Sequence, residues 1–128
     1  MLRFNAKEYG EAASRFELAR NQLTNAKAKL QAHFYHARSL QLAGQAERAL
    51  AEYTALLEAE PEGGNPFRER GMLESARLHF ELGQTEKALE SFATLAETAT
   101  TREYREEAIV RGGLLAAEAG RTEISEKL

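Results

Sequence analysis

Two histidines one helical turn apart come nearest, by residue type and spacing, to a metal site in this sequence. His33 and His36 are three positions apart, so a helix over this stretch would place both imidazoles on one face. A zinc site needs at least a third ligand, and the sequence does not place one beside the pair. His33 also falls at a position that packs in the helical pattern. We expect a structural pair and no metal; a small helical protein that handles metal or phosphate through these two residues is the alternative.

The other titratable residues form no catalytic pattern. His79 stands at a packing position of a helix, and the carboxylates, such as Glu106 and Glu107, fit solvated helix faces with Lys or Arg one turn away. The glycines of "EGGNP" at 62–66 lack the following Lys and the preceding strand of a phosphate-binding loop. No nucleophile elbow or acid–base pair stands out. We therefore expect no catalytic residue, no cofactor and no enzyme activity.

The composition excludes several further classes of protein. The 128 residues carry a net charge of -3 with mixed signs, which argues against nucleic acid and anionic membranes as partners. There is no cysteine, so disulfides and thiolate chemistry are absent, although this says nothing about compartment. No apolar run approaches the length of a membrane span, and the opening "MLRFNAKEYGE" lacks the apolar core of a secretory signal. The localisation stays unknown.

The elements that must position these residues repeat along the chain. "LAGQAERALAEY" at Leu42–Tyr53 and "ELGQTEKALESF" at Glu81–Phe92 match when Gly44 is aligned with Gly83, 39 residues later. Gly120 follows another apolar stretch after a further 37 residues. Near the start, the spacing of the second half of the motif recurs at Tyr9, Ala12, Phe16 and Ala19. A fixed period of this length is typical of stacked repeats.

Each period contains two helical patterns separated by a glycine. In the second pattern Ala46, Ala49 and Tyr53 follow the i, i+3, i+7 spacing of an amphipathic helix. A glycine before it suits the positive φ that often ends a helix. Asn65 and Pro66 read as an N-cap and a first helical residue. We expect no strands, and helices near residues 8–22, 26–43, 46–59, 66–82, 85–98 and 102–119.

The motif "A..L...G..ERAL..Y..LL...P" from Ala37 to Pro61 resembles a tetratricopeptide repeat, and "A..H...G..EKAL..F..L" from Ala76 to Leu95 is similar to it. The first copy fills the family pattern at Ala37, Leu40, Gly44, Ala49, Tyr53, Leu56 and Pro61. The second copy departs from it at His79 and Thr100. Periods above the usual 34 residues resemble the longer repeats of bacterial members.

The resemblance implies an all-α solenoid of antiparallel helix pairs, wound as a right-handed superhelix, in one domain over residues 1–128. Residues 26–63 and 64–100 would be whole repeats, with partial repeats at 1–25 and 101–128. We interpret the chain as a segment of a longer protein, with a short natural protein whose last helix frays as the alternative. Uncovered terminal helices predict either disorder after about Arg121 or self-association through these helices.

The resemblance also implies a binding surface, because the first helices of such repeats line the concave face. The residues expected there are Phe34, Tyr35, Arg38, Arg70, Leu73, Arg77, Phe80, Val110, Arg111 and Leu114. An apolar floor with arginines could hold an extended or helical peptide and pair with its carboxylates. Alternatively, Phe34 and Leu73 pack between helices and the arginines are solvated. The Lys and Asn positions that clamp chaperone tails in some members hold other residues here, which disfavours that partner.

The function expected from the resemblance is a non-catalytic interaction or scaffold module that binds a protein or peptide of unknown identity. A regulatory or accessory segment of a larger enzyme or signalling protein is the alternative.

Overall fold

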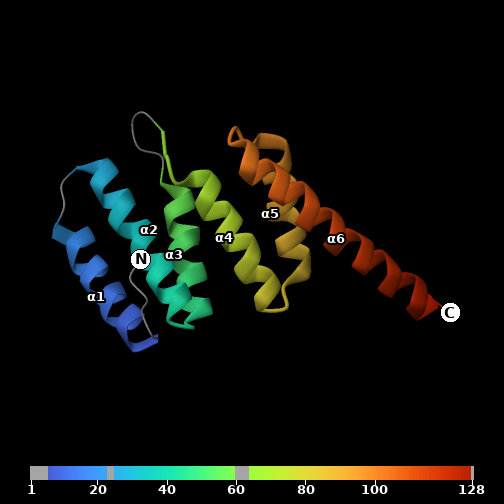
Figure 1. The fold of residues 1–128 in the computed structure, drawn as a ribbon, viewed down its shortest axis with the longest axis horizontal. Helices are drawn as coiled ribbons and strands as arrows, with labels where there is room; N and C mark the ends of the chain where they lie inside the picture. Colours follow the sequence, from blue (N-terminus) through green and yellow to red (C-terminus); the bar gives the residue numbers. More distant parts are fainter. Residues whose placement is uncertain (1–5, 23–24, 60–63, 128) are drawn as a thin grey trace. The chain divides into compact units, whose positions relative to one another are not determined.

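A computed structural model describes residues 6–22, 25–59 and 64–127, and side chains at 7–18, 25–59 and 64–120 (Figure 1). The described residues form helices and connecting turns, with no strand among them, so the expected all-helical fold is confirmed. The helices are α1 (Ala6–Gln22), α2 (Ala26–Leu42), α3 (Ala46–Glu58), α4 (Arg68–Glu81), α5 (Thr85–Thr98) and α6 (Arg102–Lys127). Within the described part of the chain, none of these helices is both long and apolar enough to cross a bilayer.

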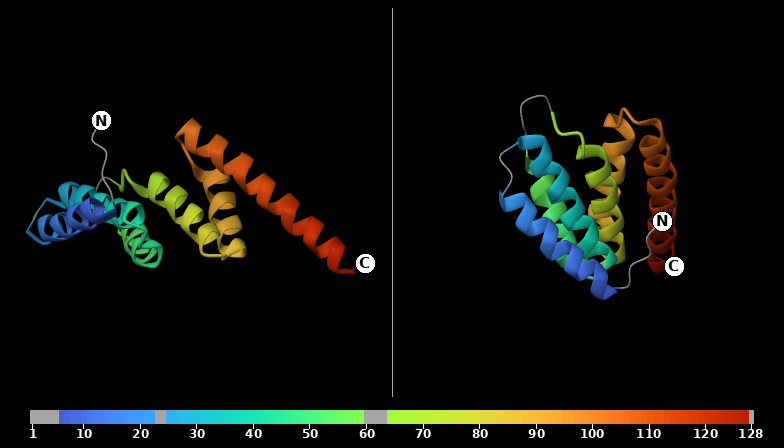
Figure 2. Two further views of the ribbon diagram at one scale, coloured as in Figure 1. Left: turned by 60° about the horizontal axis from the view of Figure 1, so that its bottom comes forward. Right: turned by 60° about the vertical axis from the view of Figure 1, so that its left-hand side comes forward.

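The chain divides into two compact units, and the division falls inside α4. Unit 1 is Met1–Gly71 and contains α1, α2, α3 and the first turn of α4, whereas unit 2 is Met72–Leu128 and contains the rest of α4, α5 and α6. Helices that are adjacent in the sequence pack against each other: α1 on α2 and α2 on α3 in unit 1, and α5 on α6 in unit 2 (Figures 1 and 2).

Two glycines end helices in the same way. Gly44 after α2 and Gly83 after α4 have φ values of 82° and 79°. In both turns the following residue donates its backbone N–H five residues back, from Gln45 to Leu40 O at 2.9 Å and from Gln84 to His79 O at 2.7 Å. This is the hydrogen bond of a Schellman C-cap, which needs a left-handed residue that glycine adopts without strain. The expected role of both glycines is confirmed.

In unit 1 the core lies where α2 and α3 cross. Ala37 and Ala49 are fully buried, and small side chains at a crossing let the two backbones approach closely. Tyr53 fills the space beside them, and its hydroxyl donates to Gln41 Oε1 at 2.8 Å. On the other side of α2, the rings of Phe16 and Tyr35 stack with their centroids 5.6 Å apart, which helps to hold α1.

Asn65 joins the link before α4 to the end of α3. Its Nδ2 donates to Leu56 O at 2.9 Å, and its Oδ1 accepts from the backbone N–H of Phe67 at 3.0 Å. The helix itself begins at Arg68, two residues later than expected, because Pro66 and Phe67 form a turn. Pro61, the other proline that the motif predicts as a break, lies outside the described residues.

In unit 2 the core is a cluster contributed by all three helices. Its buried members are Leu73, Ala76, Ala88, Phe92, Leu95, Ala99, Ala108 and Leu115. Helix α6 approaches α5 closely at Gly112, where an added Cβ atom would lie 3.2 Å from the Cβ of Phe92. A glycine is therefore useful here for its missing side chain rather than for its backbone freedom.

The expected end of the last helix is wrong. A helix over 102–119 was expected to stop at Gly120, but α6 runs through this residue to Lys127. An interior glycine costs only about 1 kcal/mol relative to alanine, which does not by itself stop a helix. In Figure 2 (left), α6 continues past the end of α5.

Candidate functional site

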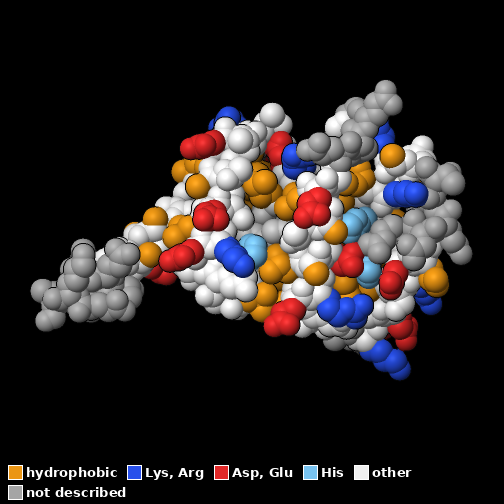
Figure 3. Space-filling model, turned by 180° about the vertical axis from the view of Figure 1, so that it is seen from behind, with side chains coloured by type: hydrophobic (Ala, Val, Ile, Leu, Met, Phe, Trp, Pro, Cys, Tyr) orange, Lys and Arg blue, Asp and Glu red, His pale blue; other side chains and the backbone are white. Residues whose placement is uncertain are grey.

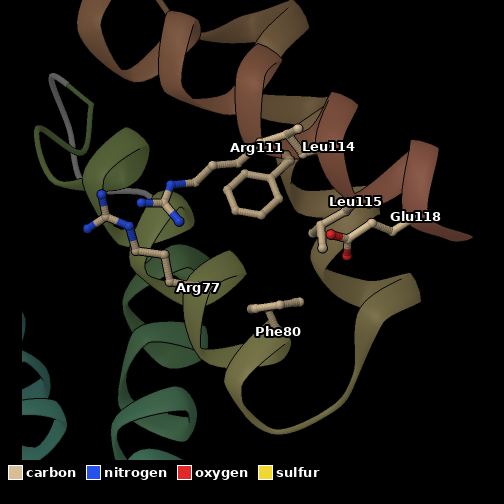
Figure 4. A pocket seen from close by; sticks show the side chains of 7 residues that line it. Arg77, Phe80, Arg111, Leu114, Leu115 and Glu118 are labelled. Carbon is tan, nitrogen blue, oxygen red and sulfur yellow. The ribbon is translucent and has the colours of Figure 1, made fainter.

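Unit 2 contains a pocket between α4 and α6 whose floor is formed by the core. We call it the α4–α6 pocket; its volume is about 590 Å³, and it is lined by Arg77, Phe80, Phe92, Arg111, Leu114, Leu115 and Glu118 (Figure 4). Phe92 and Leu115 are buried and belong to the core cluster. The repeat pattern places Phe92 on α5, and the close approach at Gly112 brings α6 against it. The packing of the core thus creates the apolar floor.

The rim of the α4–α6 pocket exposes large apolar side chains. Phe80 at the end of α4 is 51% exposed, and Leu114 on α6 is 62% exposed. Ile109 and Val110 are also more than half exposed, one to two turns before Leu114 on the same helix. In Figure 3 the part of α6 next to the grey C-terminal residues shows hydrophobic side chains among acidic ones. Grouped exposed apolar residues of this kind mark interaction surfaces more often than isolated ones do.

Four charged residues, which we call the α4–α6 ion chain, run beside the pocket with alternating sign. Arg77 Nη1 donates to Glu74 Oε1 at 2.7 Å, and its Nη2 donates to Glu107 on α6. Arg111 Nε donates to the same Oε1 of Glu107 at 2.9 Å. Glu74 is buried at one end of the chain and Arg111 is exposed at the other. The ion chain therefore ties α4 to α6 and ends with a positive charge at the pocket.

The ion chain shifts the pKa values of two of its members. Burial acts to raise the pKa of Glu107, but hydrogen bonds and attraction from Arg77 and Arg111 outweigh it, so the pKa lies below the ordinary value. Burial likewise acts to lower the pKa of Arg77, and the bonds to Glu107 and Glu74 outweigh it, so this pKa is raised. Both groups are held in their charged forms.

The two arginines and Glu118 lie at opposite ends of the α4–α6 pocket. In Figure 4 the guanidinium groups of Arg77 and Arg111 lie on one side of the pocket, and the carboxylate of Glu118 lies on the other. Arg111 bonds to Glu107 through Nε, and neither of its terminal nitrogens bonds to any other described residue. These nitrogens are the donors that an added ligand could use.

Two of the residues predicted for the binding surface, Phe34 and Leu73, are buried. Phe34 is fully buried among Tyr35, Tyr53 and Phe67, with ring centroids 5.5, 6.0 and 5.1 Å away. Leu73 is buried in the core of unit 2. Neither side chain is available to a partner, so these two predictions are corrected: both residues pack between helices, which was the alternative interpretation.

The arginines predicted for the same surface are engaged to different degrees. Arg38 donates to Gln41 Oε1 at 3.2 Å, and the guanidinium of Arg70 lies 4.8 Å from the centroid of the Phe34 ring. Arg77, which was predicted to pair with carboxylates of a partner, is bonded within the chain to Glu74 and Glu107 and keeps 34% of its side chain exposed. The remaining predicted residues lie on the surface of their own units: Tyr35 in unit 1, and Phe80, Val110, Arg111 and Leu114 in unit 2.

The two histidines of α2 face a carboxylate of α3. Glu52 Oε2 lies 2.9 Å from His33 Nε2 and 3.6 Å from His36 Nδ1, and His36 is buried. The arrangement joins α2 to α3. Among the side chains described at residues 7–18, 25–59 and 64–120, no group of three or more His, Asp or Glu is placed to hold a metal ion. At the end of α4, His79 Nδ1 lies 2.7 Å from Gln84 Oε1, inside the glycine turn.

Four of the residues that line the α4–α6 pocket were predicted from the sequence for the binding surface, namely Arg77, Phe80, Arg111 and Leu114, whereas Phe92, Leu115 and Glu118 were missed. The ion chain beside the pocket was also missed. Glu107 and Arg111 are four positions apart, so their pairing along one helix was visible in the spacing. The bond from Arg77 to Glu107 joins residues 30 apart, and no local signal indicates it. Phe92 matches Tyr53 in the aligned motif, but nothing in its spacing shows that it forms the floor of a pocket.

Comparison with known proteins finds no protein-family model, no curated protein and no solved structure that matches this chain.

Proposed function

We propose that the chain is a non-catalytic helical-repeat module that binds a peptide or protein segment. The proposal combines the resemblance to tetratricopeptide repeats with two features of the structure. Helices adjacent in the chain pack consecutively, and α2 and α4 end in the same glycine turn. The right-handed solenoid is part of this proposal.

The α4–α6 pocket is the observation that carries the proposal. Its volume falls in the range of about 300–1,000 Å³ typical of ligand sites, and its lining combines apolar side chains with a few charged ones. Recognition of peptides by helical surfaces commonly uses such apolar anchors. Complete burial of a fully exposed Leu or Phe side chain contributes roughly 1.5–3 kcal/mol, and Phe80 and Leu114 are only 51% and 62% exposed, so each would contribute roughly half of that before the cost of association.

Selection from a random peptide library displayed on phage tests this proposal, because it requires no candidate partner. We expect peptides that bind the intact chain and lose about tenfold or more in affinity for Leu114→Ala, a change of roughly 1.4 kcal/mol or more. Leu18→Ala is the matched control, because Leu18 and Leu114 are helical leucines with the same exposed fraction, 62%. Leu18 lies on α1, in the other unit.

Two outcomes would contradict the proposal. One is a library that yields no peptide dependent on the folded chain. The other is a set of peptides that bind wild type, Leu114→Ala and Phe80→Ala equally well, which would show that they do not use the α4–α6 pocket.

A further inference from the structure

We infer that the α4–α6 pocket recognises a bulky apolar side chain and a carboxylate that lie next to each other in the partner, and that Arg111 binds the carboxylate. This inference rests on the proposed function and adds the chemistry of the segment that is bound.

The apolar half of the inference follows from the floor and rim of the pocket. Phe92 and Leu115 form a floor that is continuous with the core, and Phe80 and Leu114 rise beside it. A ligand side chain placed between these four residues would meet hydrocarbon on several sides. Phenylalanine and leucine gain most from this, because they carry the largest apolar surface without a polar atom.

The carboxylate half follows from the order of charges in the α4–α6 ion chain. The signs alternate from buried Glu74 through Arg77 and Glu107 to exposed Arg111, and the next group in the series would be negative. Within the described residues, Arg111 donates a hydrogen bond only through Nε. A guanidinium can donate to a carboxylate through two nitrogens at once, so its terminal nitrogens could bind a ligand carboxylate. A carboxylate in the pocket would complete this geometry.

The guanidinium group of Arg111 determines which way the ligand lies. It is on the side of the α4–α6 pocket opposite the carboxylate of Glu118 (Figure 4), so a ligand carboxylate is attracted to the Arg111 side. Glu107, which is bonded to Arg111, disfavours a dianion there relative to a single carboxylate. We therefore assign the anionic group as an aspartate or glutamate side chain and not a phosphate.

Titration of the chain with blocked dipeptides, followed by amide NMR shifts, tests the inference. The probes are N-acetyl-Phe-Glu-amide, its neutral match N-acetyl-Phe-Gln-amide, N-acetyl-Ala-Glu-amide without the anchor, and N-acetyl-Phe-phosphoserine-amide. We expect the Phe-Glu probe to shift the signals of Phe80, Arg111 and Leu114. It should bind roughly two- to fivefold tighter than the Phe-Gln probe, the range expected for a solvent-accessible ion pair. The Ala-Glu probe should bind more weakly than both.

Arg111→Gln should remove the preference for the Phe-Glu probe over the Phe-Gln probe, so that the ratio of their affinities is close to one. Arg102→Gln is the matched control, because Arg102 is also on α6 and pairs through Nε with a glutamate four residues away, at 2.8 Å, but does not line the pocket. The control should keep the wild-type ratio. Arg111→Lys should restore part of the preference, since it keeps the charge but loses the paired donors.

The remaining outcomes each decide against one part of the inference. Equal binding of the Phe-Glu and Phe-Gln probes to wild type overturns the carboxylate assignment, even if Arg111→Gln fails to fold, while the proposed function survives through the apolar anchor. Tighter binding of the phosphoserine probe overturns the choice of a carboxylate. If no probe shifts the pocket signals and these signals instead change with protein concentration, a second copy occupies the pocket and the inference is wrong. If the phage library yields peptides that need the pocket but carry no acidic residue beside the apolar one, the inference is wrong and the proposed function stands. If the library yields no peptide that needs the folded chain, the proposed function is wrong.

Discussion

Glu107 joins the two arginines of the α4–α6 ion chain, and its protonation should be visible in the stability of the fold. Its pKa in the folded chain lies below the ordinary value of 4.5, so ionised Glu107 stabilises the folded state above that pH. This contribution is lost as the pH falls through the folded-state pKa. Urea unfolding of wild type and Glu107→Gln should therefore show wild type as the more stable protein at pH 7, with a smaller difference at pH 3.

Glu90→Gln provides the control for this prediction. Glu90 is an exposed carboxylate on α5, away from the ion chain. Its substitution should change stability little at either pH. If Glu107→Gln lowers the free energy of unfolding by the same amount at pH 3 and pH 7, the stabilisation by the ion chain does not depend on the charge of Glu107.

Gly112 and Gly113 are neighbours on α6 that should respond differently to alanine. Gly113 has no atom within 4 Å of an added Cβ, so Gly113→Ala should raise stability by about 0.5–1 kcal/mol through helix propensity. At Gly112 the added Cβ would lie 3.2 Å from the Cβ of Phe92, which is fixed to the backbone of α5. Gly112→Ala should therefore raise the stability by less than Gly113→Ala does, or lower it. Equal gains in thermal unfolding would mean that α5 and α6 are farther apart than described.

At the scale of the elements, the helix crossings depend on two alanines that the repeat pattern singles out. Ala49 on α3 and Ala88 on α5 are fully buried. Ala49→Leu and Ala88→Leu should each overpack a crossing and cost roughly 1–3 kcal/mol. Ala51→Leu and Ala93→Leu are controls on the exposed faces of the same helices and should stay within about 0.5 kcal/mol of wild type. Unchanged melting temperatures in both buried variants would show that the repeat register is wrong.

At the scale of the whole molecule, the exposed face of α6 predicts association between copies. In α4, Leu73 and Ala76 are buried in a cluster with residues of α5. Val110 and Gly113, 37 residues later and equivalent in the repeat, are exposed, as is Ile109 beside them. An uncovered apolar helix face of this kind favours self-association.

Light scattering over a concentration series measures this association. We expect the mean mass of wild type to rise with concentration and that of Ile109→Lys to stay closer to a monomer, because the charge must be desolvated on contact. Leu42→Lys serves as the control, since Leu42 is an exposed apolar residue at the end of α2. A strict monomer at all concentrations would contradict the prediction.

The helices and glycine turns could be predicted from the sequence because their causes are local. Five of the helices begin and end within two residues of the expected bounds, and apolar periodicity and helix propensity act over a few turns of chain. Gly44 and Gly83 adopt positive φ because glycine lacks a Cβ, whatever surrounds it. The small size of Ala49 and Ala88 likewise indicates close crossings from the repeat pattern alone.

Only the tertiary structure decided the composition of the candidate site. The same residue type, arginine, is bound between carboxylates at Arg77 and exposed at Arg111, because Arg77 meets Glu107 from a helix 30 residues later. Phe34 looked like a surface residue, but neighbours from α3 and the link before α4 bury it. Gly120 resembled Gly44, yet α6 continues through it, since an interior glycine costs a helix only about 1 kcal/mol relative to alanine. Such outcomes depend on contacts between distant segments, whose spacing in the sequence carries no periodic signal.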